Sequence, residues 1–127
     1  MTRQAATTDQ APSPAGPYSQ SIRAGNIVVC AGQGGAVPSG EMAEDITAQT
    51  EQCLRNVLAA LAASGAQEPD IVRVNVYLTD VTHFAAMNEV YARTFSQPYP
   101  ARTTVYVTLP AGMLIEVDAM AVVGGTS

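Results

Sequence analysis

Two ionisable side chains, Arg102 and Glu116, lie fourteen residues apart in two segments of strand-like sequence. A charge within a strand must face water, pair with an opposite charge or meet a charged ligand. The planar guanidinium of an arginine matches a carboxylate bidentately, and a partly desolvated glutamate can orient or deprotonate a water. Arg102 is therefore a candidate anchor for a small organic acid, and Glu116 a candidate for positioning or deprotonating a water. An ion pair of Arg102 with Glu116 or Asp118 is the structural alternative.

Further candidates are a tyrosine and a loop of small residues. The hydroxyl of Tyr18 can bond a substrate or a water, although a packing role for its ring is equally compatible with the sequence. Residues 31–35 are small or glutamine, so their backbone N–H groups can approach an anion or a reacting oxygen. Cys30 has no evident activating base and is not expected to be a nucleophile. His83, near a predicted helix start, is assigned no role.

The composition limits the possible functions. The chain has 127 residues, 47% of them apolar, and a net charge of −5, which predicts one globular domain over residues 1–127 and argues against nucleic-acid binding. There is no lysine, and with two cysteines and one histidine we expect no Schiff base, metal site or disulfide framework. The polar N-terminus and the lack of a long apolar run predict a cytoplasmic protein without membrane contact.

Hydrophobic periodicity predicts the elements that position these residues. Residues 1–16 read as an irregular lead-in. Short strands are expected over 19–23 and 26–30, a loop over 32–40, helices over 45–63 and 80–95, and strands over 71–79, 101–108 and 114–123. The pattern predicts an α+β domain with both helices on one face of a mixed sheet.

Strand alternation assigns side chains to the two faces of this sheet. The helix-covered face is expected to hold Val72, Val74, Val76, Val105, Val107, Val117, Ala119 and Ala121. The other face then holds Arg73, Asn75, Tyr77, Arg102, Thr104, Tyr106, Glu116, Asp118 and Met120. A face that mixes tyrosines and a methionine with charges is typical of a subunit interface, so we expect Arg102 and Glu116 to share a pocket there.

Several segments together resemble the RidA/YjgF family of imine deaminases, also called L-PSP endoribonucleases. They occur in the order typical of that family and span nearly the whole chain: Gly16-Pro17-Tyr18-Ser19-Gln20, Ala31-Gly32-Gln33, Val74 to Asp80, Met87-Asn88-Glu89-Val90-Tyr91, Pro100-Ala101-Arg102-Thr103 and Ile115 to Ala119. The resemblance implies a chorismate-mutase-like fold and a homotrimer with active clefts between subunits. It also implies hydrolysis of 2-imino and enamino acids to 2-oxo acids and ammonia, without a cofactor.

The resemblance also implies roles for individual residues. Arg102 resembles the arginine that holds the substrate carboxylate, Glu116 the acid that orients water, Tyr18 a cleft tyrosine and Gly32 a glycine whose backbone holds substrate. Two substrate-binding positions that would line the cleft depart from the common pattern, with Ala31 where many members have serine and Thr104 where many have cysteine.

These departures leave two alternatives open: adaptation to a specialised catabolic or biosynthetic substrate, or a regulatory protein that binds small carboxylates without turnover. The acidic composition disfavours the endoribonuclease activity.

Overall fold

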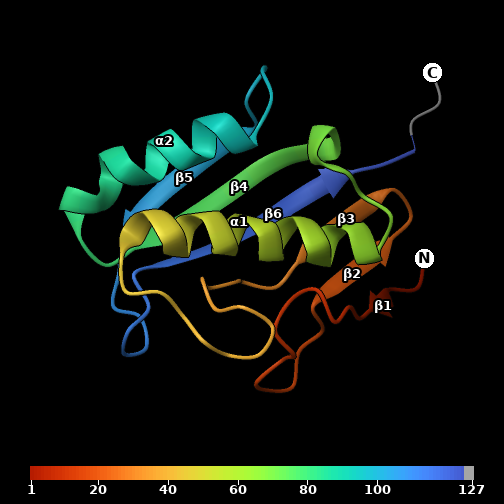
Figure 1. The fold of residues 1–127 in the computed structure, drawn as a ribbon. Coiled ribbons are helices and arrows are strands. Elements are labelled where there is room, and N and C mark those ends of the chain that lie inside the picture. Colours follow the sequence, from red (N-terminus) through yellow and green to blue (C-terminus); the bar gives the residue numbers. More distant parts are fainter. Residues whose placement is uncertain (125–127) are drawn as a thin grey trace.

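A computed structural model describes residues 1–124 as one six-stranded sheet with two helices (Figure 1). The strands lie in the order β1-β2-β3-β6-β4-β5, with β4 and β5 parallel and the other neighbours antiparallel. The elements are β1 (Gln4–Ala6), β2 (Ser21–Ala24), β3 (Ile27–Cys30), α1 (Ile46–Ala63), η1 (Glu68–Asp70), β4 (Ile71–Leu78), η2 (Val81–His83), α2 (Phe84–Thr94), β5 (Ala101–Tyr106) and β6 (Ile115–Val122).

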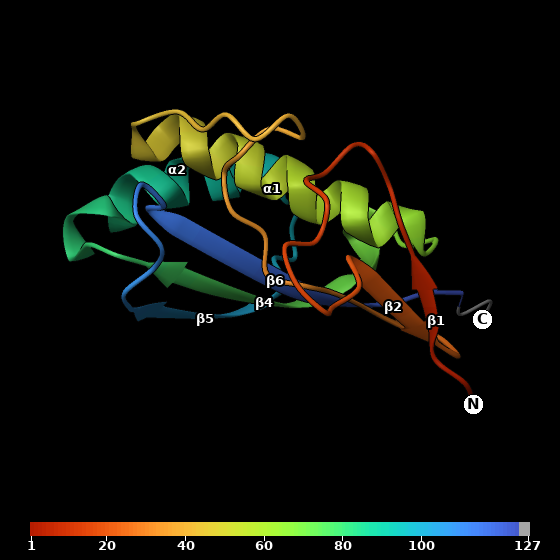
Figure 2. The ribbon, with the colours of Figure 1, turned by 90° about the horizontal axis from the view of Figure 1, so that it is seen from below.

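Both helices cover the same face of the sheet, as the sequence predicts, and leave the other face open (Figure 2). The core fills the space between the two layers. Its fully buried large side chains include Leu54, Leu61, Leu78, Met87 and Ile115. No helix in residues 1–124 is long and apolar enough to cross a membrane.

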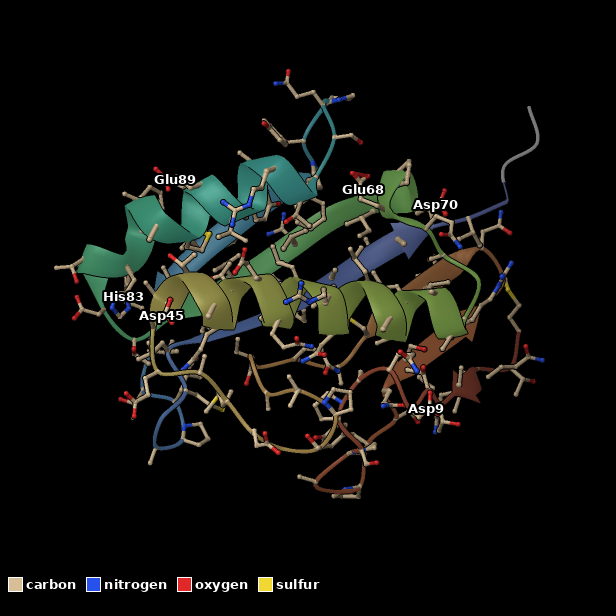
Figure 3. All side chains as sticks on the ribbon, viewed as in Figure 1. Asp9, Asp45, Glu68, Asp70, His83 and Glu89 are labelled. Carbon is tan, nitrogen blue, oxygen red and sulfur yellow. The ribbon has the colours of Figure 1, made fainter. Side chains whose placement is uncertain are left out.

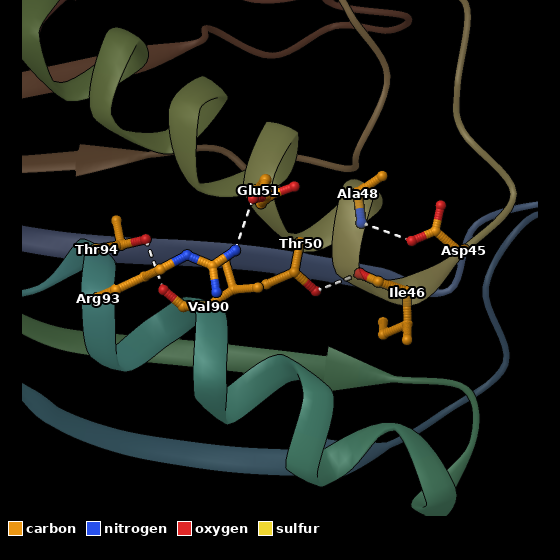
Figure 4. A network of polar contacts seen from close by, with 8 residues as sticks. All are labelled: Asp45, Ile46, Ala48, Thr50, Glu51, Val90, Arg93 and Thr94. Carbon is orange, nitrogen blue, oxygen red and sulfur yellow. Dashed lines mark hydrogen bonds and ion pairs between the residues drawn. The ribbon is translucent and has the colours of Figure 1, made fainter.

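Polar contacts fix the ends of the helices and join them to each other (Figure 4). The Asp45 carboxylate accepts a hydrogen bond from the Ala48 N–H at 3.0 Å, which caps α1. The Arg93 guanidinium donates to Glu51 across the two helices at 2.6 Å. Both side chains of this pair are largely exposed, so it contributes at most about 1 kcal/mol, and the helix layer depends on the apolar core beneath it.

A β-bulge in β4 changes which side chains face the helices. Ile71 is opposite Ala121 while Arg73 is opposite Met120, so Val72 is an extra residue in the ladder. Val72 is exposed and not in the core, and the prediction that it faces the helices is wrong. Beyond the bulge the expected alternation is confirmed by the buried Val74, Val76 and Leu78.

The predicted phase of β5 is also wrong. In the parallel ladder Val74 is opposite Arg102 and Val76 opposite Thr104, so Arg102 and Thr104 lie on the helix-covered side. Val105, opposite Tyr77, lies on the open side and is exposed. The sequence places Val105 in the core because strands usually bury their valines, but at this edge of the sheet α2 covers Arg102.

The open face of the sheet carries an exposed apolar surface. Its members are the exposed side chains Ile27, Val29, Val105 and Val122, together with the partly buried Met120. Asp118 lies among them and accepts hydrogen bonds from Asn75 at 2.8 Å and from the Tyr77 hydroxyl at 3.0 Å. An exposed apolar surface around an organised polar network is typical of an interaction surface.

The lead-in over residues 1–16 is more ordered than predicted, because Gln4–Ala6 pairs with β2 as an edge strand. The Gln20 side chain holds the segment that follows. Its amide donates to the carbonyls of Thr8 and Pro12 at 3.0 and 2.9 Å and its carbonyl accepts from the Thr8 N–H at 2.8 Å. This buried glutamine therefore replaces strand pairing for a segment without secondary structure of its own.

Candidate functional site

Three of the predicted site residues line one cavity of about 470 Å³. Glu116 lies on β6, Tyr18 follows the lead-in, and Gly32 lies in the loop after β3. Backbone hydrogen bonds of 2.8 and 2.9 Å join Gln33 to Val117 in both directions, so this loop runs beside the strand that carries Glu116. The Tyr18 hydroxyl accepts a hydrogen bond from the Ala15 N–H at 3.0 Å, which leaves its own proton available to a ligand.

Gly32 and the Glu116 carboxylate are in close contact. A Cβ atom built on Gly32 would lie 2.6 Å from Glu116 Oε2 and 2.9 Å from its Cδ. Only a glycine therefore allows the carboxylate to lie against the backbone at this point. The absence of a side chain at Gly32 therefore determines where the Glu116 carboxylate can lie.

Burial raises the pKa of Glu116 above its ordinary value, and the nearby negative charge of Asp118 raises it further. A carboxyl with a raised pKa is a better proton acceptor than an exposed glutamate once it is ionised. Glu116 can therefore hold a water in the cavity and take a proton from it.

Arg102 lies in a different environment, under α2. Its guanidinium carbon lies 4.7 Å from the centre of the Tyr91 ring and 5.7 Å from that of Phe84, and Nη1 lies 3.8 Å from the Met87 sulfur. These contacts orient the guanidinium by cation–π and sulfur interactions without neutralising it. Arg102 also lines a second cavity of about 310 Å³ with Asn88, Tyr91, Ala92, Tyr99 and Pro100.

The structure therefore separates the two residues that the sequence brought together. Arg102 lies on the helix-covered side of the sheet and Glu116 on the open side, so the prediction that both residues lie on the same face of the sheet is wrong. The alternative of an ion pair is also not found, because within residues 1–124 the guanidinium of Arg102 contacts no carboxylate. Arg102 retains the capacity to bind an anion.

The two atypical positions, Ala31 and Thr104, do not line either cavity in the described part of the chain. The Ala31 N–H donates to the backbone carbonyl of Gln20 at 2.9 Å, beside the first cavity. Thr104 lies opposite Val76 on the helix-covered side. The expectation that both line the cleft is therefore not met within one chain.

Sequence reasoning missed the buried polar side chains of α1 that hold the cavity loops. Asn56 donates to the carbonyls of Gly34 and Ala36 at 2.9 and 2.7 Å. Gln49 donates to the carbonyls of Ala43 and Gly112, each at 2.8 Å. Both side chains are fully buried. Their seven-residue spacing places them on one helix face beside the apolar stripe, and this was the available signal.

Neither cysteine is suited to nucleophilic chemistry. Burial raises the pKa of Cys30 to about 12, and the pKa of the fully buried Cys53 is raised even more strongly. Cys53 instead contacts the Gln33 carbonyl oxygen at 3.0 Å and belongs to the packing of the loop. In residues 1–124, no group of three His, Cys, Asp or Glu side chains lies together as metal ligands would.

Charge on the described surface does not favour RNA. Acidic side chains are spread over the described surface, among them Asp9 in the lead-in, Asp45 before α1, Glu68 and Asp70 in η1, and Glu89 on α2 (Figure 3). Binding to a phosphate backbone needs clustered cations, whereas the cations here are six arginines spread from Arg3 to Arg102.

A sheet with two helices on one face, with a half-buried carboxyl and a stacked arginine in separate cavities, defines a small α+β ligand-binding domain. The family model described as Endoribonuclease L-PSP matches residues 8–123. The chain belongs to this family, which is the RidA/YjgF family that its motifs resemble.

Known relatives match over nearly the whole chain. A RutC family protein of Pyrococcus horikoshii is 49% identical, over 90% of this chain and 93% of its own length. The 2-iminobutanoate/2-iminopropanoate deaminase of Salmonella typhimurium is 39% identical, over 91% of this chain and 94% of its own length. The crystal structure of RidA from an Antarctic Psychrobacter species superimposes with a TM-score of 0.91 and 41% identity, over 94% of this chain and 99% of that one.

Proposed function

We propose that the protein hydrolyses 2-imino acids, and the enamines that tautomerise to them, to 2-oxo acids. Water adds to the C=N carbon, the C–N bond breaks, and ammonia leaves with the protons supplied by that water. No electron acceptor is needed. The main support is the Glu116 carboxyl, which has a raised pKa and lies in a cavity large enough for a small acid.

Each proposed residue has one chemical task. Arg102 binds the substrate carboxylate, and its stacking on Tyr91 holds the guanidinium plane ready for a bidentate contact. Glu116 orients the attacking water and accepts its proton. The Tyr18 hydroxyl and the backbone at Gly32 position the substrate nitrogen or the developing amine. Holding substrate and water in line can lower the barrier by several kcal/mol.

We propose that a working site needs two copies of the chain, with Arg102 from one and Glu116 from the other. The sheet separates these residues within a chain, so they can meet only across an interface. The exposed apolar surface of the open face supports self-association. A homotrimer is the assembly that we propose, and ultracentrifugation of the purified protein tests it.

The activity is tested by coupling the protein to a threonine dehydratase, which releases the enamine of 2-iminobutanoate. We expect 2-oxobutanoate, measured with lactate dehydrogenase, to appear with a shorter lag when the protein is present. Arg102→Ala should abolish this effect, since an uncompensated carboxylate costs about 100-fold or more. An unchanged lag at high protein concentration would contradict the proposal.

Mixing two impaired variants tests the shared site directly. Arg102→Ala and Glu116→Ala proteins should each keep only a small residual rate, and their subunits should be unfolded and refolded together. Random assembly places an intact Arg102 opposite an intact Glu116 in roughly a quarter of the sites of a cyclic oligomer. Recovery of about that fraction of activity supports the two-copy site, whereas no recovery by a correctly assembled mixture excludes it.

A further inference from the structure

The cavity beside Glu116 has an apolar wall that the proposed chemistry does not explain. The hydrolytic step uses Glu116, Tyr18 and the backbone at Gly32. Seven other lining residues are apolar: Pro12, Ala15, Ala36, Met42, Pro110, Ala111 and Met113. These side chains can pack against an apolar ligand chain, but they cannot form hydrogen bonds with a polar one.

Two methionines form the movable part of this wall. The Met113 methyl would lie 2.7 Å from a Cβ atom on Gly34, so the side chain lies against bare backbone at that position. The Met42 methyl lies 3.5 Å from the corresponding position on Gly112, which has a φ of +85°. Each thioether thus packs on a glycine, and methionine changes rotamer at low cost.

The backbone that carries these methionines is fixed by Gln49. Its side-chain amide bonds the carbonyls of Ala43 and Gly112, and its carbonyl accepts from the Leu114 N–H at 2.9 Å. Ala43 follows Met42, and Gly112 and Leu114 flank Met113. Because Gln49 is fully buried, the two loops cannot separate without breaking these bonds. The result is a rigid frame lined by flexible side chains.

We propose that Met42 and Met113 form the subsite for the substrate side chain and select 2-imino acids with extended apolar chains. The inference rests on the proposed function, because it places the C=N carbon beside Glu116. The flexible thioethers move aside for a longer chain and then pack along it. Each added methylene that they bury should raise kcat/KM by about threefold.

The test measures kcat/KM for a graded series of 2-imino acids. An amino acid oxidase with catalase generates them in place from alanine, 2-aminobutanoate, norvaline and norleucine, and competition with semicarbazide trapping reports hydrolysis. The wild-type protein should prefer the norleucine-derived imine over the alanine-derived imine by about tenfold or more. Met42→Ala/Met113→Ala should reduce this preference at least about fivefold. The matched control Met42→Leu/Met113→Leu should retain it.

Each outcome has one meaning. A wild-type preference for the shorter imines, or a preference that the double alanine variant leaves unchanged, overturns the subsite although deamination itself stands. The single variant Met42→Ala gives the same comparison if the double variant unfolds.

If no imine is hydrolysed, calorimetry that compares the binding of pyruvate with that of 2-oxohexanoate tests the subsite by itself. Tighter binding of the longer acid that is lost in the methionine variants supports the subsite while the proposed deaminase fails. Equal binding overturns the subsite as well.

Discussion

Gly32→Ala should impair catalysis without unfolding the protein. The new Cβ would lie 2.6 Å from Glu116 Oε2 and 2.9 Å from Cδ. Ordinary contacts begin near 3.4 Å, so the carboxylate must move by roughly 0.5–1 Å from its present position. A displacement of that size at a group that orients a reacting water costs about 100-fold in kcat/KM.

Stability should change little, because the loop at Gly32 is exposed and its backbone does not have a positive φ. Thermal unfolding of the variant should therefore follow that of the wild type. Gly16→Ala is the matched control. Its Cβ would contact the Tyr18 ring at 3.6 Å, an ordinary van der Waals distance, and activity should be retained.

A double-mutant cycle identifies the cause. In a Glu116→Ala background there is no carboxylate for the new methyl to displace, so Gly32→Ala should have no further effect on the residual rate. Wild-type kcat/KM in Gly32→Ala would refute the reasoning, as would an effect that persists undiminished without Glu116.

Four further predictions concern polar side chains of the site and of the core. Since the pKa of Glu116 is raised in the folded state, its ionisation weakens the fold as pH rises from the ordinary glutamate value through that raised value. Glu116→Gln should therefore gain melting temperature over the wild type across this window, although it is inactive; a constant difference would argue against the shift. Asp118→Asn removes a like charge and should move the acid limb of kcat/KM to lower pH; an unmoved limb would mean that Glu116 does not titrate there. The Tyr91 hydroxyl is buried with no hydrogen-bond partner in residues 1–124, so Tyr91→Phe should stabilise by about 1 kcal/mol in urea unfolding, with the exposed Tyr106→Phe as control. A loss of stability would reveal a partner supplied by another chain. Gln49→Ala removes three buried hydrogen bonds and should destabilise by about 3 kcal/mol; a change under 1 kcal/mol would show that the loops are held otherwise.

Much of the fold could be predicted because periodicity reports burial. The helix over 45–63 and the β6 alternation from Val117 to Ala121 match the structure closely. The prediction failed where alternation is not the controlling factor. A bulge at Val72 shifts the phase of β4 by one residue, and bulges leave no reliable mark in a single sequence.

The site was predicted as a set of residues but not as an arrangement. Tyr18, Gly32 and Glu116 do share a cavity. Arg102 does not, because its strand is an edge strand whose apolar face is the open one. An arginine between a sheet and a helix that carries aromatic side chains is unusual. Because arginine is hydrophilic, hydropathy predicts such a residue to be exposed to solvent. Gln49 and Asn56 were missed for a related reason, because hydropathy predicts amide side chains to be exposed even where they are buried.

The position of Arg102 and Glu116 on opposite faces of one sheet has a consequence for how the protein behaves on dilution. No loop movement or rotamer change can bring the two groups together within one chain, because the backbone of the sheet lies between them. Under the proposed function, specific activity is then a property of chain concentration. It should collapse below the dissociation constant of the assembly while every chain stays folded. A cell that lowers expression of such a protein would lose activity more steeply than it loses protein.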